Sequence, residues 1–335
     1  MEFDESEANP SDVIDQRGQS TGGGGGIGGL GGLVGGGGSL GGVGGGILAS
    51  VLGGLLSGRR GRAGGGVGLL ALVAVGFLVV RSLAAGGFDI GSTRNLNRIP
   101  SLPGASTDQP VGSGNAADVA NDPQAADVKF ANFVITDANN VWTEQVKNYQ
   151  RTKLVLYSNA VDTGCGAATK DAGPFYCPAD SLVYLDLSFW GELQSKYGGG
   201  GDFAEAYVIA HEVGHHVQKE LGITDEVERA ERQNPDQVKG ADGLSVRVEL
   251  QADCLAGVWA HTQYAKGSLQ SGDIEEAINA ATAVGDDSIQ RSAVGRVQPD
   301  TFTHGTSTQR VKWFRTGFDS GSSDHCDTFS VDSLG

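Results

Sequence analysis

Apolar residues follow two different patterns along the chain, and the change between them falls near residue 126. Beyond it, the segments 153–161 and 181–189 carry β-branched and aromatic residues in strand-like runs. Helical apolar spacing recurs in five other segments, 127–146, 203–221, 244–265, 274–285 and 308–318. A helix, a few strands and then mainly helices predict one α+β domain over residues 126–335.

The first 62 residues have no such periodicity. Residues 1–20 are acidic and almost free of large apolar groups, and a tract of glycines with scattered Leu, Val and Ile follows them. Of the 55 glycines in the chain, 27 lie between residues 18 and 68, so the glycine surplus belongs to this region and not to the domain. Because glycine loses the most backbone entropy on ordering, the pattern predicts a disordered acidic and Gly-rich N-terminal arm over residues 1–62.

An uncharged run of 18 residues follows, from residue 63 to residue 80. A membrane-spanning helix needs roughly 17–25 apolar residues, and a buried core helix is disfavoured because the run has no polar face. The sequence therefore predicts a transmembrane helix over 63–82 and a flexible linker rich in Ser, Asn, Gly and Pro over 83–125. Three arginines precede the run and one follows it, which predicts a single-pass anchor with a cytoplasmic N-terminus and an extracytoplasmic domain.

Charge and cysteine content narrow the class of protein further. The net charge of −16 falls wholly on residues 101–335, which hold 33 acidic and 17 basic side chains, so no nucleic-acid partner is expected. All four cysteines lie beyond the predicted span, as expected for disulfides in an exported domain. Cys165 and Cys177 bracket a short loop, which favours pairing them and leaves Cys254 for Cys326. Three pairings are possible, and buried free thiols are the alternative in a reducing compartment.

The segment His211-Glu212-Val213-Gly214-His215 carries the clearest chemistry. On a helix, residues four apart project from the same face, so both imidazoles can bind one Zn²⁺. Glu212 lies about 100° around the helix from His211, where it can act as the general base on a water molecule. The spacing therefore predicts a catalytic metal site, with one zinc ion per chain.

A third protein ligand is expected from the helix at 244–265, where Glu249 and Asp253 lie four residues apart on one face. Glu249 fits the third ligand position, and Asp253 fits an acceptor for the free N–H of a liganding imidazole. The alternative is a solvated helix face, which the surrounding apolar residues disfavour. Two His and one Glu leave a fourth position open, as in catalytic zinc sites.

Four segments, GPFYCPAD, AYVIAHEVGHHVQ, RVELQADCLAGVWA and FTHGTSTQRVKWFRTGF, occur in an order that resembles the neutral zinc metallopeptidase family of bacterial membrane-anchored proteins. The resemblance covers roughly residues 125–330. It implies a zincin-like, gluzincin-type domain with an HExxH helix packed under a small sheet. It also implies that His211, His215 and Glu249 are the zinc ligands and that Glu212 is the catalytic base.

These features predict a membrane-anchored zinc endopeptidase that acts on a peptide or protein substrate. A non-catalytic, membrane-tethered binding module stabilised by zinc is the alternative. His304 is our candidate for stabilising the oxyanion, followed by Tyr184 and Tyr207, although His304 also fits a plain loop residue. The strand near residues 182–187 is either a core strand or an edge that pairs with an extended substrate.

Overall fold

The computed structural model describes residues 1–18, 122–197 and 200–335, all of which belong to one compact unit. The predicted transmembrane helix, the Gly-rich tract and most of the predicted linker lie outside these residues. Among the helices that are described, none combines the length and apolarity that crossing a bilayer requires.

A four-stranded sheet with the order β1-β2-β6-β5 forms one layer of the unit. Its strands are β1 (Val13–Asp15), β2 (Lys153–Tyr157), β5 (Phe175–Cys177) and β6 (Leu182–Asp186). The first three in spatial order run parallel, and β5 is antiparallel to β6. Since β6 lies between two strands, it is not a sheet edge, and the expectation that it could pair with a substrate is wrong; β5 is the edge on that side. A separate hairpin joins β3 (Ala160–Thr163) to β4 (Gly166–Thr169).

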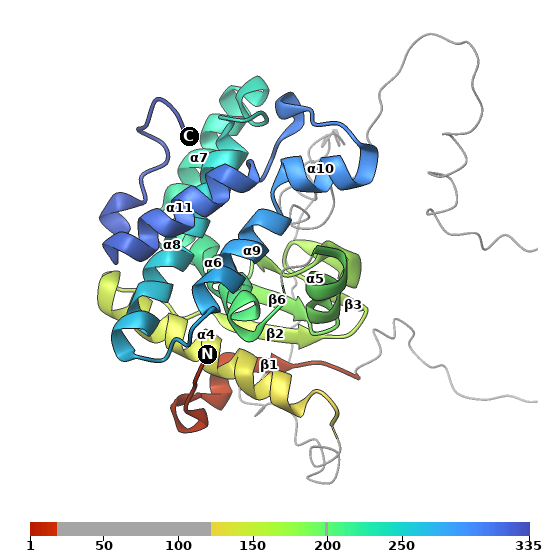
Figure 1. Cartoon of the computed structure of the whole chain (residues 1–335), viewed down its shortest axis with the longest axis vertical. Helices are drawn as coiled ribbons and strands as arrows, with labels where there is room; N and C mark the ends of the chain where they lie inside the picture. The colour runs from red at the N-terminus through yellow and green to blue at the C-terminus, as the bar shows by residue number, and fades with distance from the viewer. Residues whose placement is uncertain (19–121, 198–199) are drawn as a thin grey trace, which may run out of the picture. The chain divides into compact units, whose positions relative to one another are not determined.

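The five predicted helices are all present. They are α4 (Ala125–Gln145), α6 (Asp202–Glu220), α8 (Leu244–Lys266), α9 (Asp273–Ala283) and α11 (Ser307–Ser320). Three further helices were not predicted, α5 (Phe189–Tyr197), α7 (Ile223–Gln233) and α10 (Asp286–Val294). Helix α7 was not predicted because its segment is mostly polar, and Val227 is its one buried residue. The fold is a helix-rich α+β arrangement in which α6, α8, α9 and α11 lie together on one side of the sheet (Figure 1).

Helix α8 lies at the centre of the helical layer, and every residue from Leu250 to Ala260 is buried. It crosses α11 at two glycines. A Cβ on Gly257 would lie 2.0 Å from the carbonyl oxygen of Phe314, and one on Gly317 would lie 1.9 Å from that of Cys254. Only glycine permits so close an approach of two helix backbones, so this crossing is specified by the sequence.

The first 18 residues belong to the domain, which corrects the prediction that they are disordered. Strand β1 pairs in parallel with β2, and Phe3 and Met1 pack against the core. The α-amino group of Met1 forms ion pairs with Asp202 at 2.8 Å and with Asp273 at 3.2 Å. The prediction failed because the segment has few large apolar residues, and its order comes from long-range pairing with β2.

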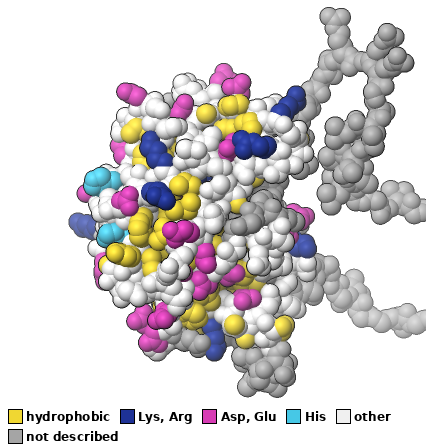
Figure 2. Space-filling view, viewed as in Figure 1, with side chains coloured by type: hydrophobic (Ala, Val, Ile, Leu, Met, Phe, Trp, Pro, Cys, Tyr) yellow, Lys and Arg dark blue, Asp and Glu magenta, His cyan; other side chains and the backbone are white. Residues whose placement is uncertain are grey.

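Both predicted disulfides are present. Cys165, in the turn between β3 and β4, is bonded to Cys177 in β5, and Cys254 in α8 is bonded to Cys326 near the C-terminus. Acidic side chains outnumber basic ones on the face shown in Figure 2, in line with the negative charge of residues 101–335.

Candidate metal centre and active site

Helix α6 presents the HExxH motif toward α8. His211 and Glu212 are each 3% exposed, and His215 is only partly exposed. Gly214 lets the two helices approach, because a Cβ there would lie 3.0 Å from the carbonyl oxygen of Ala252. The helix ends at Glu220, and Gly222 shortly after it has the left-handed φ of 77°. The motif is therefore held in the interior and not on a solvated helix face.

Glu249 of α8 completes a group of three side chains that could hold a metal ion. Its Oε2 lies 3.4 Å from His211 Nε2, and its Oε1 lies 3.6 Å from His215 Nε2. Ligands about 2.0–2.2 Å from a tetrahedral zinc ion are separated by roughly 3.3–3.6 Å. Both ring nitrogens of His211 and the Oε2 of Glu249 are buried and form no hydrogen bond of normal geometry within the described part of the chain. The donor set and its spacing thus fit one zinc ion.

Asp253 supports His211 from behind, as the sequence predicted. Its Oδ1 lies 2.9 Å from His211 Nδ1, which leaves Nε2 directed toward Glu249. Arg310 of α11 donates two hydrogen bonds to the same carboxylate, at 2.9 Å from Nε and 2.8 Å from Nη2. Tyr207 donates a third at 2.5 Å. Although burial alone would raise the pKa of Asp253, Arg310 and His211 lower it below its usual range, so it stays a carboxylate.

A second chain of hydrogen bonds orients His215. Its Nδ1 lies 2.9 Å from Gln218 Oε1, and Gln218 donates to Gln251 Oε1 at 3.0 Å. Gln251 in turn donates to the carbonyl oxygen of Cys326 at 3.0 Å. Each imidazole of the motif therefore has its Nδ1 beside a fixed acceptor, which leaves both Nε2 atoms free for a metal.

Glu212 lies on the sheet side of the site. The backbone amide of Tyr176, in the edge strand β5, donates a hydrogen bond to its carboxylate. Burial raises the pKa of Glu212, while His215 and His211 act in the opposite direction. A carboxylate with a raised pKa next to a metal-binding cluster is suited to proton transfer.

His304 is held rigidly in the loop before α11. The buried Asp286 accepts hydrogen bonds from the backbone amides of Thr303, His304 and Gly305, at 2.7, 2.7 and 3.0 Å. The Nδ1 of His304 lies 3.1 Å from Asp286 Oδ1, and its buried Nε2 has no partner among the described residues. His304 is close enough to Glu249 to lower the pKa of that carboxylate, after His211 and His215.

The other two oxyanion candidates are wrong. Tyr207 uses its hydroxyl on Asp253, behind the ligands, and Tyr184 donates to Asp180 at 2.7 Å in a separate hydrophobic cluster. Sequence reasoning missed Arg310, Asp286 and the two glutamines, because a lone polar residue in a helical segment normally indicates a solvated face.

A second group of acidic residues, Asp202 at the start of α6 and Asp273 and Glu276 at the start of α9, also has oxygens close enough to share a cation. Asp202 and Asp273 already pair with the ammonium group of Met1. The histidine-containing group is therefore the better candidate for the metal centre.

Comparison with known proteins agrees with this geometry. A family model described as "Putative neutral zinc metallopeptidase" matches residues 1–329. The "Uncharacterized protein YpfJ" of Escherichia coli K12 is 50% identical over 232 residues, which cover 68% of this chain and 80% of that protein. The "Uncharacterized protein Rv2575" of Mycobacterium tuberculosis is 45% identical over 206 residues, 58% of this chain and 68% of that protein. No solved structure matches the chain significantly.

Proposed function

Because the chain belongs to the neutral zinc metallopeptidase family, we propose that it is a zinc-dependent endopeptidase whose ligands are His211, His215 and Glu249. The observation that carries the proposal is the position of Glu212. A structural zinc site is closed by four protein ligands, whereas here three ligand side chains converge next to a buried carboxylate that binds no metal. Such an arrangement serves proton transfer at an open coordination position.

Zinc, when bound, polarises a peptide carbonyl and lowers the pKa of a water molecule toward about 7. Glu212 accepts the proton of the attacking water and passes it to the leaving amine, and its hydrogen bond from Tyr176 keeps the carboxylate in place. His304 stabilises the carbonyl oxygen as negative charge develops on it. Asp286, 3.1 Å from Nδ1, orients the ring, and the buried Nε2 is the atom left to face that oxygen.

We also propose where the enzyme acts and how it holds its substrate. The two disulfides are expected to persist in an oxidising compartment, so the domain works outside the cytosol. An extended peptide can add to β5, the edge strand of the sheet, whose residue Tyr176 is next to Glu212. The acidic surface favours basic substrates, and this preference weakens at high salt.

The test is Glu212→Gln, which keeps the size of the side chain and removes the base. We expect zinc content to stay at one ion per chain, while hydrolysis of a mixture of unstructured peptides, read by mass spectrometry, falls at least 100-fold. Glu220→Gln, at the end of the same helix, is the matched control and keeps full activity.

Two results would count against the proposal. Undiminished hydrolysis by Glu212→Gln excludes Glu212 as the base. A wild-type chain that binds one zinc but cleaves no peptide supports the alternative, a binding module that zinc only stabilises.

A further inference from the structure

The N-terminal residues are an integral strand of the peptidase domain and not an appendage. Val13, Ile14 and Asp15 pair in parallel with Leu154, Val155 and Leu156 of β2. The amide of Gln16 extends the ladder by donating to the carbonyl oxygen of Leu156 at 2.8 Å. Figure 1 shows β1 lying along β2, next to α4. The sheet is complete on this side only when the N-terminal segment is docked.

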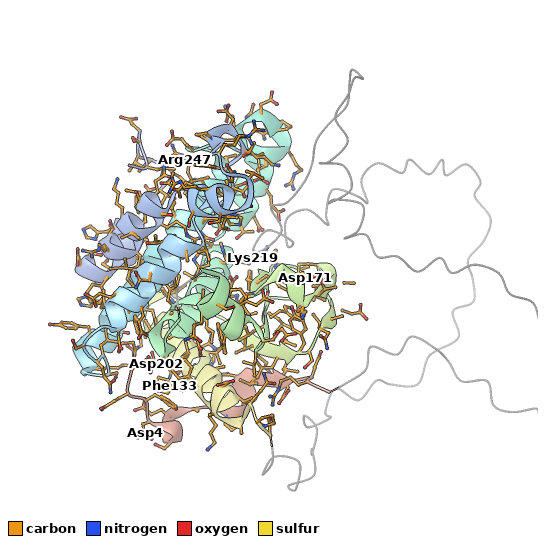
Figure 3. The ribbon with its side chains drawn as sticks, turned by 45° about the vertical axis from the view of Figure 1, so that its right-hand side comes forward. Asp4, Phe133, Asp171, Asp202, Lys219 and Arg247 are labelled. Atoms are coloured by element: carbon orange, nitrogen blue, oxygen red, sulfur yellow. A yellow bond between two sulfur atoms is a disulfide. The ribbon has the colours of Figure 1, made fainter. Side chains whose placement is uncertain are left out.

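Side chains before β1 are also buried in the domain. The ring of Phe3 lies 5.3 Å from those of Phe130 and Phe133 in α4. The carboxylate of Asp12, 3% exposed, is neutralised by Arg151. Figure 3 labels Asp4 in this segment, Phe133 in α4 and Asp202 at the start of α6, all toward the lower end of the view. The segment therefore makes apolar, charged and backbone contacts with the domain, as a part of a folded interior does, and it docks specifically.

The described residues on either side of the gap at 19–121 are also in contact. Arg17, close to the last described residue of the N-terminal segment, donates from Nη2 to Asp122 at 2.7 Å. Asp122 is the first described residue after the gap, and Arg17 contacts Gln124 as well, at 3.3 Å. The side chain of Arg17 is 14% exposed. The two described ends that flank residues 19–121 therefore meet on the surface of the domain.

We infer that residues 1–18 and residues 122–335 occupy the same compartment, on one side of any membrane to which the chain is anchored. A strand cannot pair with a sheet across a hydrocarbon layer of about 30 Å, so one crossing at 63–82 is incompatible with the fold. This inference concerns topology and does not depend on peptidase activity.

Cysteine labelling of the full chain tests the inference. Ser6 and Ser158 are both exposed, one in the N-terminal segment and one directly after β2, and Ser→Cys is nearly isosteric at each. We expect Ser6→Cys and Ser158→Cys to react to the same extent, within about twofold, with a membrane-impermeant maleimide in intact spheroplasts. The unsubstituted chain measures background from the native cysteines, and lysed spheroplasts give full labelling. Labelling of position 158 with protection of position 6, or the reverse, would overturn the inference.

A photo-cross-link provides a second measurement that does not depend on accessibility. Phe3→benzoylphenylalanine in the full chain in native membranes should form an adduct with the α4 peptide that carries Phe130 and Phe133. The same replacement at the exposed Tyr264 is the control and should give no α4 adduct. Absence of the Phe3 adduct, with the control protein equally abundant, would show that the segment does not dock and would overturn the docking on which the inference rests.

Discussion

Asp253→Asn is the most informative single change near the metal site. The substitution keeps the shape of the side chain but removes the charge that faces Arg310, which is 2% exposed. It also weakens the acceptor beside His211 Nδ1, which lies 2.9 Å from the carboxylate. We therefore expect a loss of stability and a loss of zinc affinity from the same variant.

The size of both effects follows from the contacts. At the Arg310–Asp253 separation of 2.8 Å, two unit charges attract by about 6 kcal/mol at an effective dielectric constant of about 20. Desolvation of both groups offsets most of this attraction, but removing one partner leaves the other charge buried alone, which typically costs 3–5 kcal/mol. In a domain of this size that cost lowers the melting temperature by roughly 6–20 °C. Loss of the support for a liganding histidine weakens zinc binding about 10- to 100-fold.

Thermal unfolding with a chelator present measures the first effect, and competition with a zinc indicator measures the second. Asp253→Asn combined with Arg310→Met removes both charges, so we expect the double variant to unfold above the temperature predicted by adding the single changes. Arg232→Met, at an arginine 65% exposed in α7, is the matched control and should alter stability by less than about 0.5 kcal/mol. A loss below about 1 kcal/mol for Asp253→Asn would refute the view that Arg310 depends on this carboxylate.

Two further predictions concern the helices that carry the site. Burial, with Asp127, Asp202 and Glu276 nearby, raises the pKa of Glu205 from 4.5 to about 7. Between these two pH values the folded state holds a proton that the unfolded state releases. The stability of the fold therefore falls as the pH rises from about 4.5 to 7. After a discount for partial exposure, Glu205→Gln should be more stable than the parent by about 1–2 kcal/mol at pH 8 and equal to it at pH 4, and equal stability at both would contradict the raised pKa. Gly317→Ala should cost at least 1–3 kcal/mol in denaturant unfolding, because its Cβ would overlap the carbonyl oxygen of Cys254. Gly191→Ala, which has no neighbour within 4 Å, is its control, and similar losses from both would refute the close crossing.

The sequence predicted the parts of this protein that depend on local spacing. His211, Glu212 and His215 lie within five residues on one helix, and Glu249 and Asp253 lie four apart on another, so helical periodicity alone groups them. It could not predict β1, because three residues with two apolar side chains in an acidic segment resemble a disordered tail. It also missed Arg310, whose burial depends on the crossing of α8 and α11.

The two histidines that we propose as zinc ligands are oriented by separate routes, and both routes pass through α8 into the last part of the chain. His211 is fixed by Asp253, which Arg310 of α11 holds, and His215 is fixed through Gln218 and Gln251 to the carbonyl oxygen of Cys326. The disulfide to Cys254 ties that carbonyl to the residue that follows Asp253. The HExxH helix therefore supplies the ligands, whereas their orientation is set by α8, α11 and the C-terminal segment. A helix with the same motif but without these partners would still place the histidines four residues apart, but it would offer no acceptors for their Nδ1–H groups. Zinc binding would then have to immobilise two freely rotating rings, which would weaken it.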